Sequence, residues 1–129
     1  MISLETARKL KEAGLKWERQ IGDFLWSQYT SSNRGVLLIR EDENEEYPGD
    51  TIQTWLPRLD QMLAEIEKLG YEWELGILTL NDGRTYMIDV ALEELIKTES
   101  EEWKSFVANS PEEATAQVLL WILEQEVTP

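Results

Sequence analysis

The chain has 129 residues, a formal net charge of −14 and neither Cys nor His. We expect residues 1–129 to fold as one globular domain, because this length suits a single hydrophobic core. The missing residue types exclude disulfides, most structural zinc sites and every Ser-His or Cys-His nucleophilic pair. Asp, Glu, Lys and Tyr could still act as catalytic groups, so an enzyme is disfavoured but stays an open alternative.

The first predicted element is an amphipathic helix over residues 4–13. Ser3 can cap its first turn, and Gly14 is a typical C-terminal stop. Leu4 and Leu10 belong to its apolar face, which follows the helical period.

The stretch from residue 16 to 30 is compatible with a helix or a strand. The aromatic run 24–30 favours a strand, and residues 31–35 have the composition of a turn. Residues 36–39 then form a short apolar run. We therefore expect a first β-hairpin, followed by an acidic loop over residues 41–50.

A second helix is predicted after this loop. Apolar residues recur at helical spacing from Leu59 to Leu69, Pro57 suits a first helical turn, and Gly70 is a stop signal.

The second predicted hairpin turns at Asp82-Gly83, a strong two-residue hairpin signal. This turn would place Thr79 opposite Tyr86, and Ile77 opposite Ile88. Its second face is also apolar. We expect a helix or a second copy of the chain to cover that face, so a homodimer is one expected state. The residues concerned are Leu78, Leu80 and Met87.

The C-terminal part contains a short predicted helix at residues 91–96 and a segment, 103–108, that suits a strand or irregular structure. Ser110 and Pro111 begin a closing helix that runs to about residue 125. The order is α-β-β-α-β-β-(α)-α. It predicts an α+β fold in which three main helices pack on one antiparallel sheet of two hairpins, with about four strands.

Carboxylates dominate the chain after its first third. Residues 1–40 carry seven Lys or Arg against four Asp or Glu, whereas residues 41–129 carry five against 22. This surface attracts basic partners and repels nucleic acid and anionic membranes, although solubility alone also explains it. The candidate acidic binding residues are Glu41, Asp42, Glu43, Glu45, Glu46, Asp50, Glu93, Glu94, Glu99, Glu101 and Glu102.

Two specific uses of these carboxylates are considered. In the run 41–46, alternating oxygen ligands are typical of calcium loops, but the sixth position counted from Asp42 is Tyr47, where such a loop needs Gly. We therefore predict no metal site. A row of carboxylates could instead imitate a nucleic-acid backbone, which carries about one charge per 1.7 Å of duplex axis.

The six tryptophans are the second candidate feature. Trp17, Trp55 and Trp103 lie at the edges of predicted elements, so we expect them to be partly exposed and available for binding. Trp73 and Trp121 lie on predicted buried faces and are assigned to the core.

No catalytic residues and no cofactor are predicted. Acidic pairs such as Glu112-Glu113 are adjacent in sequence and point in different directions on a helix. The chain also lacks a Gly-rich phosphate loop and the common serine-nucleophile motifs.

Several segments resemble small uncharacterised proteins encoded by bacteriophages and prophages of Gram-positive bacteria. The resemblance implies a small accessory protein made inside a bacterial cell, and it assigns no activity and no functional residues. Its second segment also favours a strand in the ambiguous region. The segments are residues 3–14, 22–24, 55–63, 110–114 and 119–123.

These observations favour a non-catalytic protein-interaction factor with an unidentified protein partner, and the acidic surface favours a basic one. The alternatives are an inhibitor that mimics nucleic acid, of the anti-restriction or anti-CRISPR type, and a carboxylate-dependent enzyme using Mg²⁺. No apolar run reaches transmembrane length and residues 1–10 lack the features of a signal peptide, so we expect a cytoplasmic protein without direct contact to membrane or nucleic acid.

Overall fold

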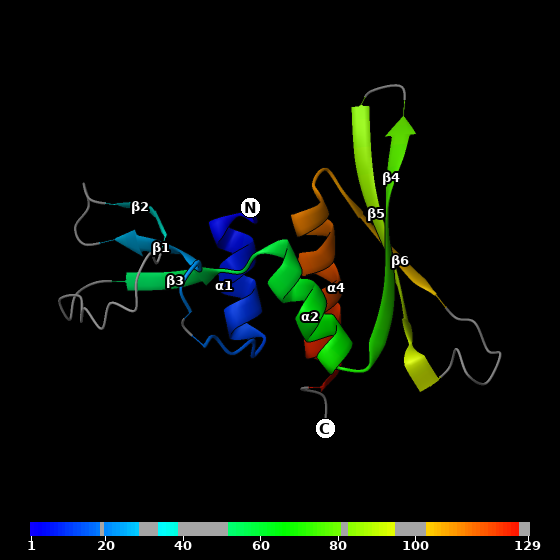
Figure 1. Ribbon diagram of the computed structural model, residues 1–129, viewed down its shortest axis with the longest axis horizontal. Coiled ribbons are helices and arrows are strands. Elements are labelled where there is room, and N and C mark those ends of the chain that lie inside the picture. Colours follow the sequence, from blue (N-terminus) through cyan, green and yellow to red (C-terminus); the bar gives the residue numbers. More distant parts are fainter. Residues whose placement is uncertain (19, 29–33, 39–51, 81–82, 95–102, 127–129) are drawn as a thin grey trace. The chain divides into compact units, whose positions relative to one another are not determined.

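The computed structural model describes residues 1–18, 20–28, 34–38, 52–80, 83–94 and 103–126. The chain divides into two compact units, residues 1–58 and 59–129, and each is described by itself. The described residues form three helices and six strands (Figure 1). The α+β class predicted from the sequence is confirmed, whereas the single-domain expectation stays a prediction.

The first unit combines one helix with a three-stranded antiparallel sheet in the order β2-β1-β3. The helix packs against β3, and Leu10, Leu25 and Leu56 are buried in this unit. As expected, Ser3 caps the helix and accepts a hydrogen bond from the Thr6 amide at 3.1 Å. The elements are α1 (Leu4–Glu12), β1 (Phe24–Gln28), β2 (Arg34–Leu38) and β3 (Ile52–Leu56).

The predicted first hairpin is confirmed, and its strands pair so that Phe24 lies opposite Leu38. The third strand, β3, was not predicted. Its sequence alternates between a buried set, including Thr54 and Leu56, and the half-buried Trp55, which is the period of a strand. The expected acidic loop, residues 41–50, lies outside the described residues.

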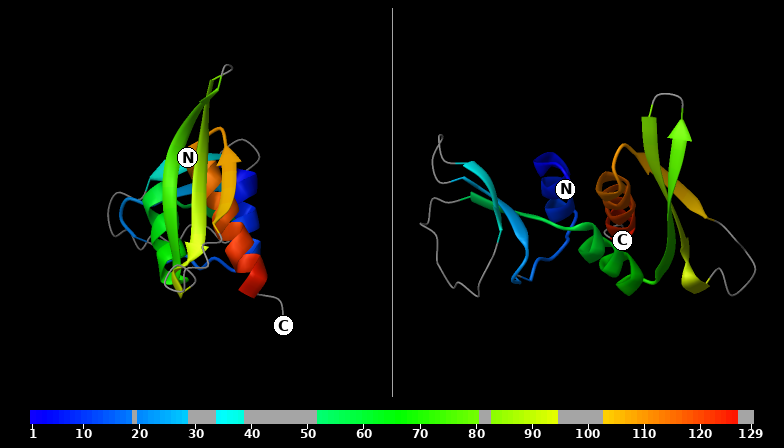
Figure 2. Two further views of the ribbon diagram at one scale, coloured as in Figure 1. Left: turned by 90° about the vertical axis from the view of Figure 1, so that its right-hand side faces the viewer. Right: turned by 45° about the horizontal axis from the view of Figure 1, so that its top comes forward.

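The second unit packs two helices on one face of a three-stranded antiparallel sheet, in the order β4-β5-β6. The Trp121 ring of α4 contacts Tyr71 and Phe106, with ring centroids 5.9 and 5.8 Å apart. Figure 2 (left) shows this sheet in front of the helices. The elements are α2 (Leu59–Lys68), β4 (Tyr71–Leu80), β5 (Gly83–Leu92), β6 (Lys104–Ala108) and α4 (Pro111–Glu126).

The predicted register of the second hairpin is wrong by two residues. Thr79 lies opposite Arg84 and Ile77 opposite Tyr86, because Gly83 pairs with Leu80 as a strand residue. Side chains alternate with a period of two, so this shift leaves every side chain on its predicted face.

Three further expectations are corrected, and one alternative that the sequence left open is decided. The strands form two sheets of three strands instead of one sheet with about four strands. Residues 91–92 extend β5, where a helix was expected; residues 93–94 are helical, and residues 95–96 lie outside the described part. The segment 103–108, for which strand and irregular structure were both open, contains β6. The second helix begins at Leu59 instead of at Pro57.

Gly83 provides a test of the backbone conformation at the start of β5. Its φ of +134° is a conformation that L side chains rarely adopt, whereas Gly76 in β4 has open space around an added Cβ and no positive φ. We expect Gly83→Ala to lower the free energy of unfolding by about 1–3 kcal/mol, and Gly76→Ala to change it by less than about 0.5 kcal/mol. Urea unfolding of both variants measures the difference, and equal effects would contradict the positive φ of Gly83.

Candidate functional site

All six tryptophans are half-buried, so exposure alone does not separate a binding set from a core set. Trp73 and Trp121, which the sequence assigned to the core, are half-buried as well. Both nevertheless make internal contacts: Trp73 donates to Glu67 Oε1 at 3.0 Å, and Trp121 packs on two aromatic rings. Among the candidate binding tryptophans, the structure brings Trp17 and Trp55 together in the first unit, whereas Trp103 lies in the second.

Most of the candidate acidic residues fall outside the described part of the chain. Of this set, the structure describes only Glu93 and Glu94, which are exposed directly after β5. Within the described ranges, no three acidic residues come close enough to hold a metal ion. The residues that lie outside are Glu41, Asp42, Glu43, Glu45, Glu46, Asp50, Glu99, Glu101 and Glu102.

A pocket with a volume of about 110 Å³ lies in the first unit. The indole rings of Trp17 and Trp55 stack beside it, with centroids 6.1 Å apart and planes inclined by only 11°. This offset parallel arrangement is a favourable geometry for two aromatic rings. The lining residues are Ala7, Lys11, Leu15, Trp17, Trp55 and Pro57.

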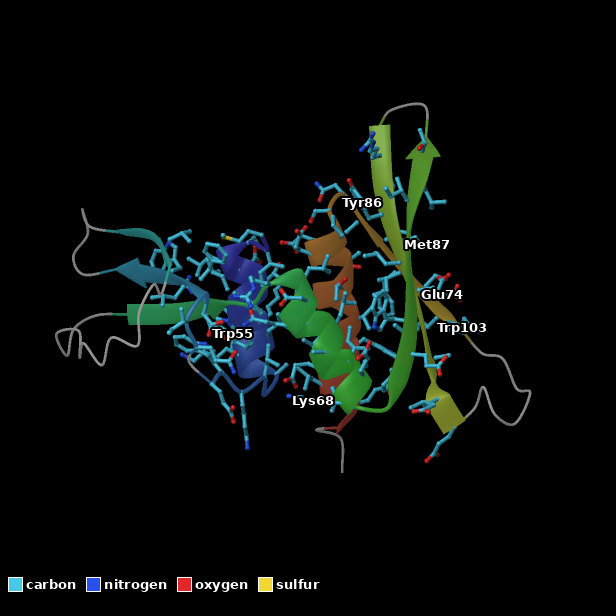
Figure 3. The ribbon with its side chains drawn as sticks, viewed as in Figure 1. Trp55, Lys68, Glu74, Tyr86, Met87 and Trp103 are labelled. Atoms are coloured by element: carbon cyan, nitrogen blue, oxygen red, sulfur yellow. The ribbon has the colours of Figure 1, made fainter. Side chains whose placement is uncertain are left out.

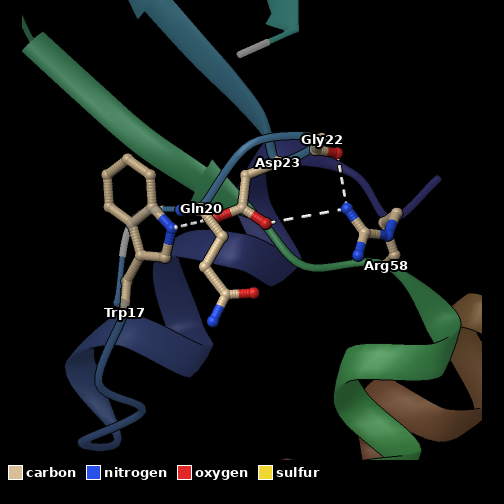
Figure 4. A network of polar contacts seen from close by, with 5 residues as sticks. All are labelled: Trp17, Gln20, Gly22, Asp23 and Arg58. Atoms are coloured by element: carbon tan, nitrogen blue, oxygen red, sulfur yellow. Dashed lines mark hydrogen bonds and ion pairs between the residues drawn. The ribbon is translucent and has the colours of Figure 1, made fainter. Parts of the chain in front are cut away.

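The position of Trp17 is fixed by a polar network centred on Asp23, whose side chain is 0% exposed. Asp23 Oδ2 accepts hydrogen bonds at 2.8 Å from Trp17 Nε1 and from the backbone N–H of Gln20 (Figure 4). Arg58 Nη1 lies 3.6 Å from Asp23 Oδ1 and also donates to the Gly22 carbonyl. A buried carboxylate needs such partners, because an unpaired one is strongly destabilising.

The second indole of the stack, that of Trp55, differs from the first in its hydrogen bonding. Trp55 Nε1 is buried and has no hydrogen-bond partner among the described residues. A buried donor without an acceptor costs about 1–3 kcal/mol relative to a solvated one. The ring of Trp55 is therefore kept in place by packing, whereas that of Trp17 is also held by a charged acceptor.

The second unit offers a different surface, the face of the sheet turned away from α2 and α4, which we call the outer face. Leu78 is 37% exposed and Val107 50% exposed, and the half-buried Met87 pairs directly with Val107. Figure 3 shows Glu74 and Trp103 on this side of the sheet. The outer-face residues include Glu72, Glu74, Gly76, Leu78, Thr85, Met87, Asp89, Ala91, Ser105 and Val107.

Of the two covers expected, α2 and α4 do not supply one, because both helices pack on the inner face. The Leu80 side chain lies outside the described part. Cover by a second copy of the chain stays a prediction.

Acidic side chains border the apolar part of the outer face. Glu74 lies directly opposite Asp89 in the register of β4 and β5, and Ser105 Oγ donates to Asp89 Oδ1 across β5 and β6. Two carboxylates in directly opposite positions repel each other, so this arrangement slightly destabilises the sheet.

From the sequence we identified Trp17 and Trp55 at the pocket and Trp103 at the outer face, but not the residues that surround them. Lys11, Leu15 and Pro57 gave no separate signal, because they reach the pocket only through the packing of α1 on β3. Asp23 could be recognised only as part of a Gly-Asp dipeptide, which is typical of turns.

Comparisons with protein families, curated proteins and solved structures gave no significant match. None of the helices in the described ranges combines the length and the apolar character that crossing a bilayer requires.

Replacing each of the two stacked tryptophans by Phe should lower the stability of the protein by different amounts. Trp17→Phe removes a donor from the buried Asp23 carboxylate, and we expect it to cost about 1.5–3 kcal/mol of unfolding free energy from this loss alone. Trp55→Phe removes an unpartnered donor, which offsets part of the lost packing, so its cost should be smaller. Chemical denaturation of the two variants tests this order, and a larger loss for Trp55→Phe would contradict it.

Proposed function

We propose that this chain is a non-catalytic interaction protein whose outer face binds a protein segment with apolar residues flanked by Lys or Arg. The observation that carries the proposal is an apolar group on this face, formed by the exposed Leu78 and Val107 and the half-buried Met87 and bordered by Glu72 and Glu74.

The apolar group is not explained by folding of the second unit. The inner face of the same sheet already supplies a core, in which Ile88 and Val90 are 0% and 1% exposed. Removing apolar side chains from water lowers the free energy, and on the other face this happens only when a partner covers them. Gly76, which lies opposite Met87, leaves open space beside it that a side chain of the partner can enter.

The charges define the chemistry of the partner. Glu72, Glu74 and Asp89 lie on the outer face, and the exposed Glu93 and Glu94 follow at the end of β5. A basic rim on the partner would relieve the repulsion between Glu74 and Asp89 and complement the remaining carboxylates. The half-buried Trp103 adds an aromatic side chain of the kind that anchors interfaces.

The proposal includes the cellular context that the sequence resemblance implies. The chain would act in the cytoplasm of a bacterial cell, as an accessory protein of phage or prophage origin.

A second candidate is an inhibitor that mimics nucleic acid and occupies the basic groove of a nucleic-acid-binding protein. It is supported by Glu74 and Asp89, which hold two carboxylates side by side despite their repulsion. The two functions differ in salt dependence. A surface of carboxylates alone loses affinity steeply as salt rises, whereas an apolar interface with a charged rim loses less.

The experiment compares two substitutions of the same residue type. Val107→Arg changes the outer face, and Val36→Arg changes a similarly exposed valine of the first unit, 48% against 50% exposed. Immobilised wild-type protein and both variants are exposed to bacterial lysate, and bound proteins are identified by mass spectrometry. We expect a partner that is retained by Val36→Arg and lost at least tenfold with Val107→Arg.

Two results would contradict this function. One is a partner that Val107→Arg retains as well as wild type does, and the other is the absence of any partner at low and at physiological salt. Release of a nucleic-acid-binding partner by moderate salt would favour the mimic instead.

The repulsion on the outer face gives a further prediction. Glu74→Gln removes one of two opposed carboxylates, so we expect it to raise the free energy of unfolding by about 0.2–1 kcal/mol. The same change should weaken binding of a basic partner. Thermal unfolding and a binding titration measure both effects, and Glu12→Gln on α1 is the control, since Glu12 is exposed and lies in the other unit. Lower stability of Glu74→Gln would contradict the assigned repulsion.

A further inference from the structure

The pocket of the first unit is independent of the proposed protein interface and has the size of a single ring. Its volume is about 110 Å³. A dry apolar cavity of about 150 Å³ in a protein core binds benzene, so one six-membered ring is near the upper limit of what this pocket can take. Larger ligands would have to leave most of their surface outside it.

The walls of the pocket are suited to an apolar or aromatic ring. Two parallel indoles, Pro57 and Leu15 line it, and Pro57 is fully buried. Such walls favour ring-shaped ligands through contact area and through stacking or edge contacts with the indoles.

Lys11 gives the pocket its charge preference. It is the one ionisable residue among the six that line the pocket, and its side chain is exposed. Its ammonium group has no ion-pair partner in the described part of the chain, whereas Lys9 on the same helix lies 3.6 Å from Glu5. A cation beside apolar walls favours a ligand with a negative charge next to its ring.

The pocket is also preorganised. Trp17 lies between α1 and β1, outside any helix or strand, yet its indole is held by the fully buried Asp23. A ligand that enters therefore meets a wall already in position, which reduces the entropy lost on binding.

We infer that this pocket binds a small organic anion that consists of one ring and one carboxylate, with the ring against the indoles of Trp17 and Trp55 and the carboxylate at Lys11.

The test titrates the whole protein with three probes of nearly equal size: phenylacetate, neutral phenylacetamide and the cation benzylamine. Binding is followed by NMR through the indole N–H signals of Trp17 and Trp55, assigned with the Trp→Phe variants. We expect phenylacetate to bind with a Kd on the order of 1 mM, as is usual for a ligand of this size. Phenylacetamide should bind about 3- to 5-fold more weakly, and benzylamine more weakly still.

Two lysine variants separate the effect of the Lys11 charge at the pocket from the effect of the net charge of the protein. Lys11→Gln should weaken phenylacetate binding about 3- to 5-fold and leave phenylacetamide binding unchanged. Lys9→Gln, with the same change in charge on the same helix but outside the pocket, should alter neither by more than about 1.5-fold. Val107→Arg should bind phenylacetate as wild type does, which separates this site from the proposed protein interface.

Three outcomes would overturn the inference. They are no shift of either indole signal at 10 mM phenylacetate, equal affinity for phenylacetate and phenylacetamide, and equal weakening by Lys9→Gln and Lys11→Gln.

N-acetylphenylalanine, which presents a ring and a carboxylate as a peptide C-terminus does, distinguishes two sources of the ligand. Tighter binding than phenylacetate supports a peptide end, and weaker binding supports a free organic acid.

Discussion

The first unit depends on how one buried charge is satisfied. Asp23 has no exposed surface, and its carboxylate is paired by an indole N–H, a backbone amide and the guanidinium group of Arg58. Asp23 precedes β1 and Arg58 follows β3, so the pair joins the start of one strand to the end of its neighbour. Removing one partner would leave a charge in a low dielectric, which proteins tolerate poorly. The network therefore fixes both the sheet and the ring of Trp17.

The second unit is stabilised by apolar packing instead. Trp121 lies against Tyr71 and Phe106, and the Lys104 ammonium lies 4.5 Å from the Trp121 ring centroid, in a cation–π arrangement. These contacts all lie on the inner face of the sheet. The outer face, in contrast, holds two opposed carboxylates, Glu74 and Asp89. A surface that costs stability is more easily explained by binding than by folding.

The sequence predicted local structure well and long-range pairing poorly. Alternation placed the side chains of residues 75–79 in β4 and 85–90 in β5 on their correct faces, but the register was wrong by two residues, since a period of two cannot detect a shift of two. β3 was missed because it follows an acidic stretch of the sequence and pairs with β1, which is distant in the chain. The same pairing brings Trp55 to Trp17. Element edges therefore pointed to two residues of the proposed ligand pocket, whereas their stacking and the proposed role of Lys11 follow from tertiary structure.

The two proposed sites prefer opposite charges, although the whole chain carries −14. Local charge decides this preference, because salt screens exposed charges beyond about 8 Å at physiological ionic strength. An anion beside Lys11 therefore responds to that ammonium group more than to distant carboxylates, and a basic segment on the outer face responds to Glu72, Glu74 and Asp89. The sequence already contains this division, with seven basic against four acidic residues in positions 1–40 and five against 22 in the remainder. Net charge controls the solubility and encounter rates of such a chain, whereas the few charges beside each apolar surface select what binds there.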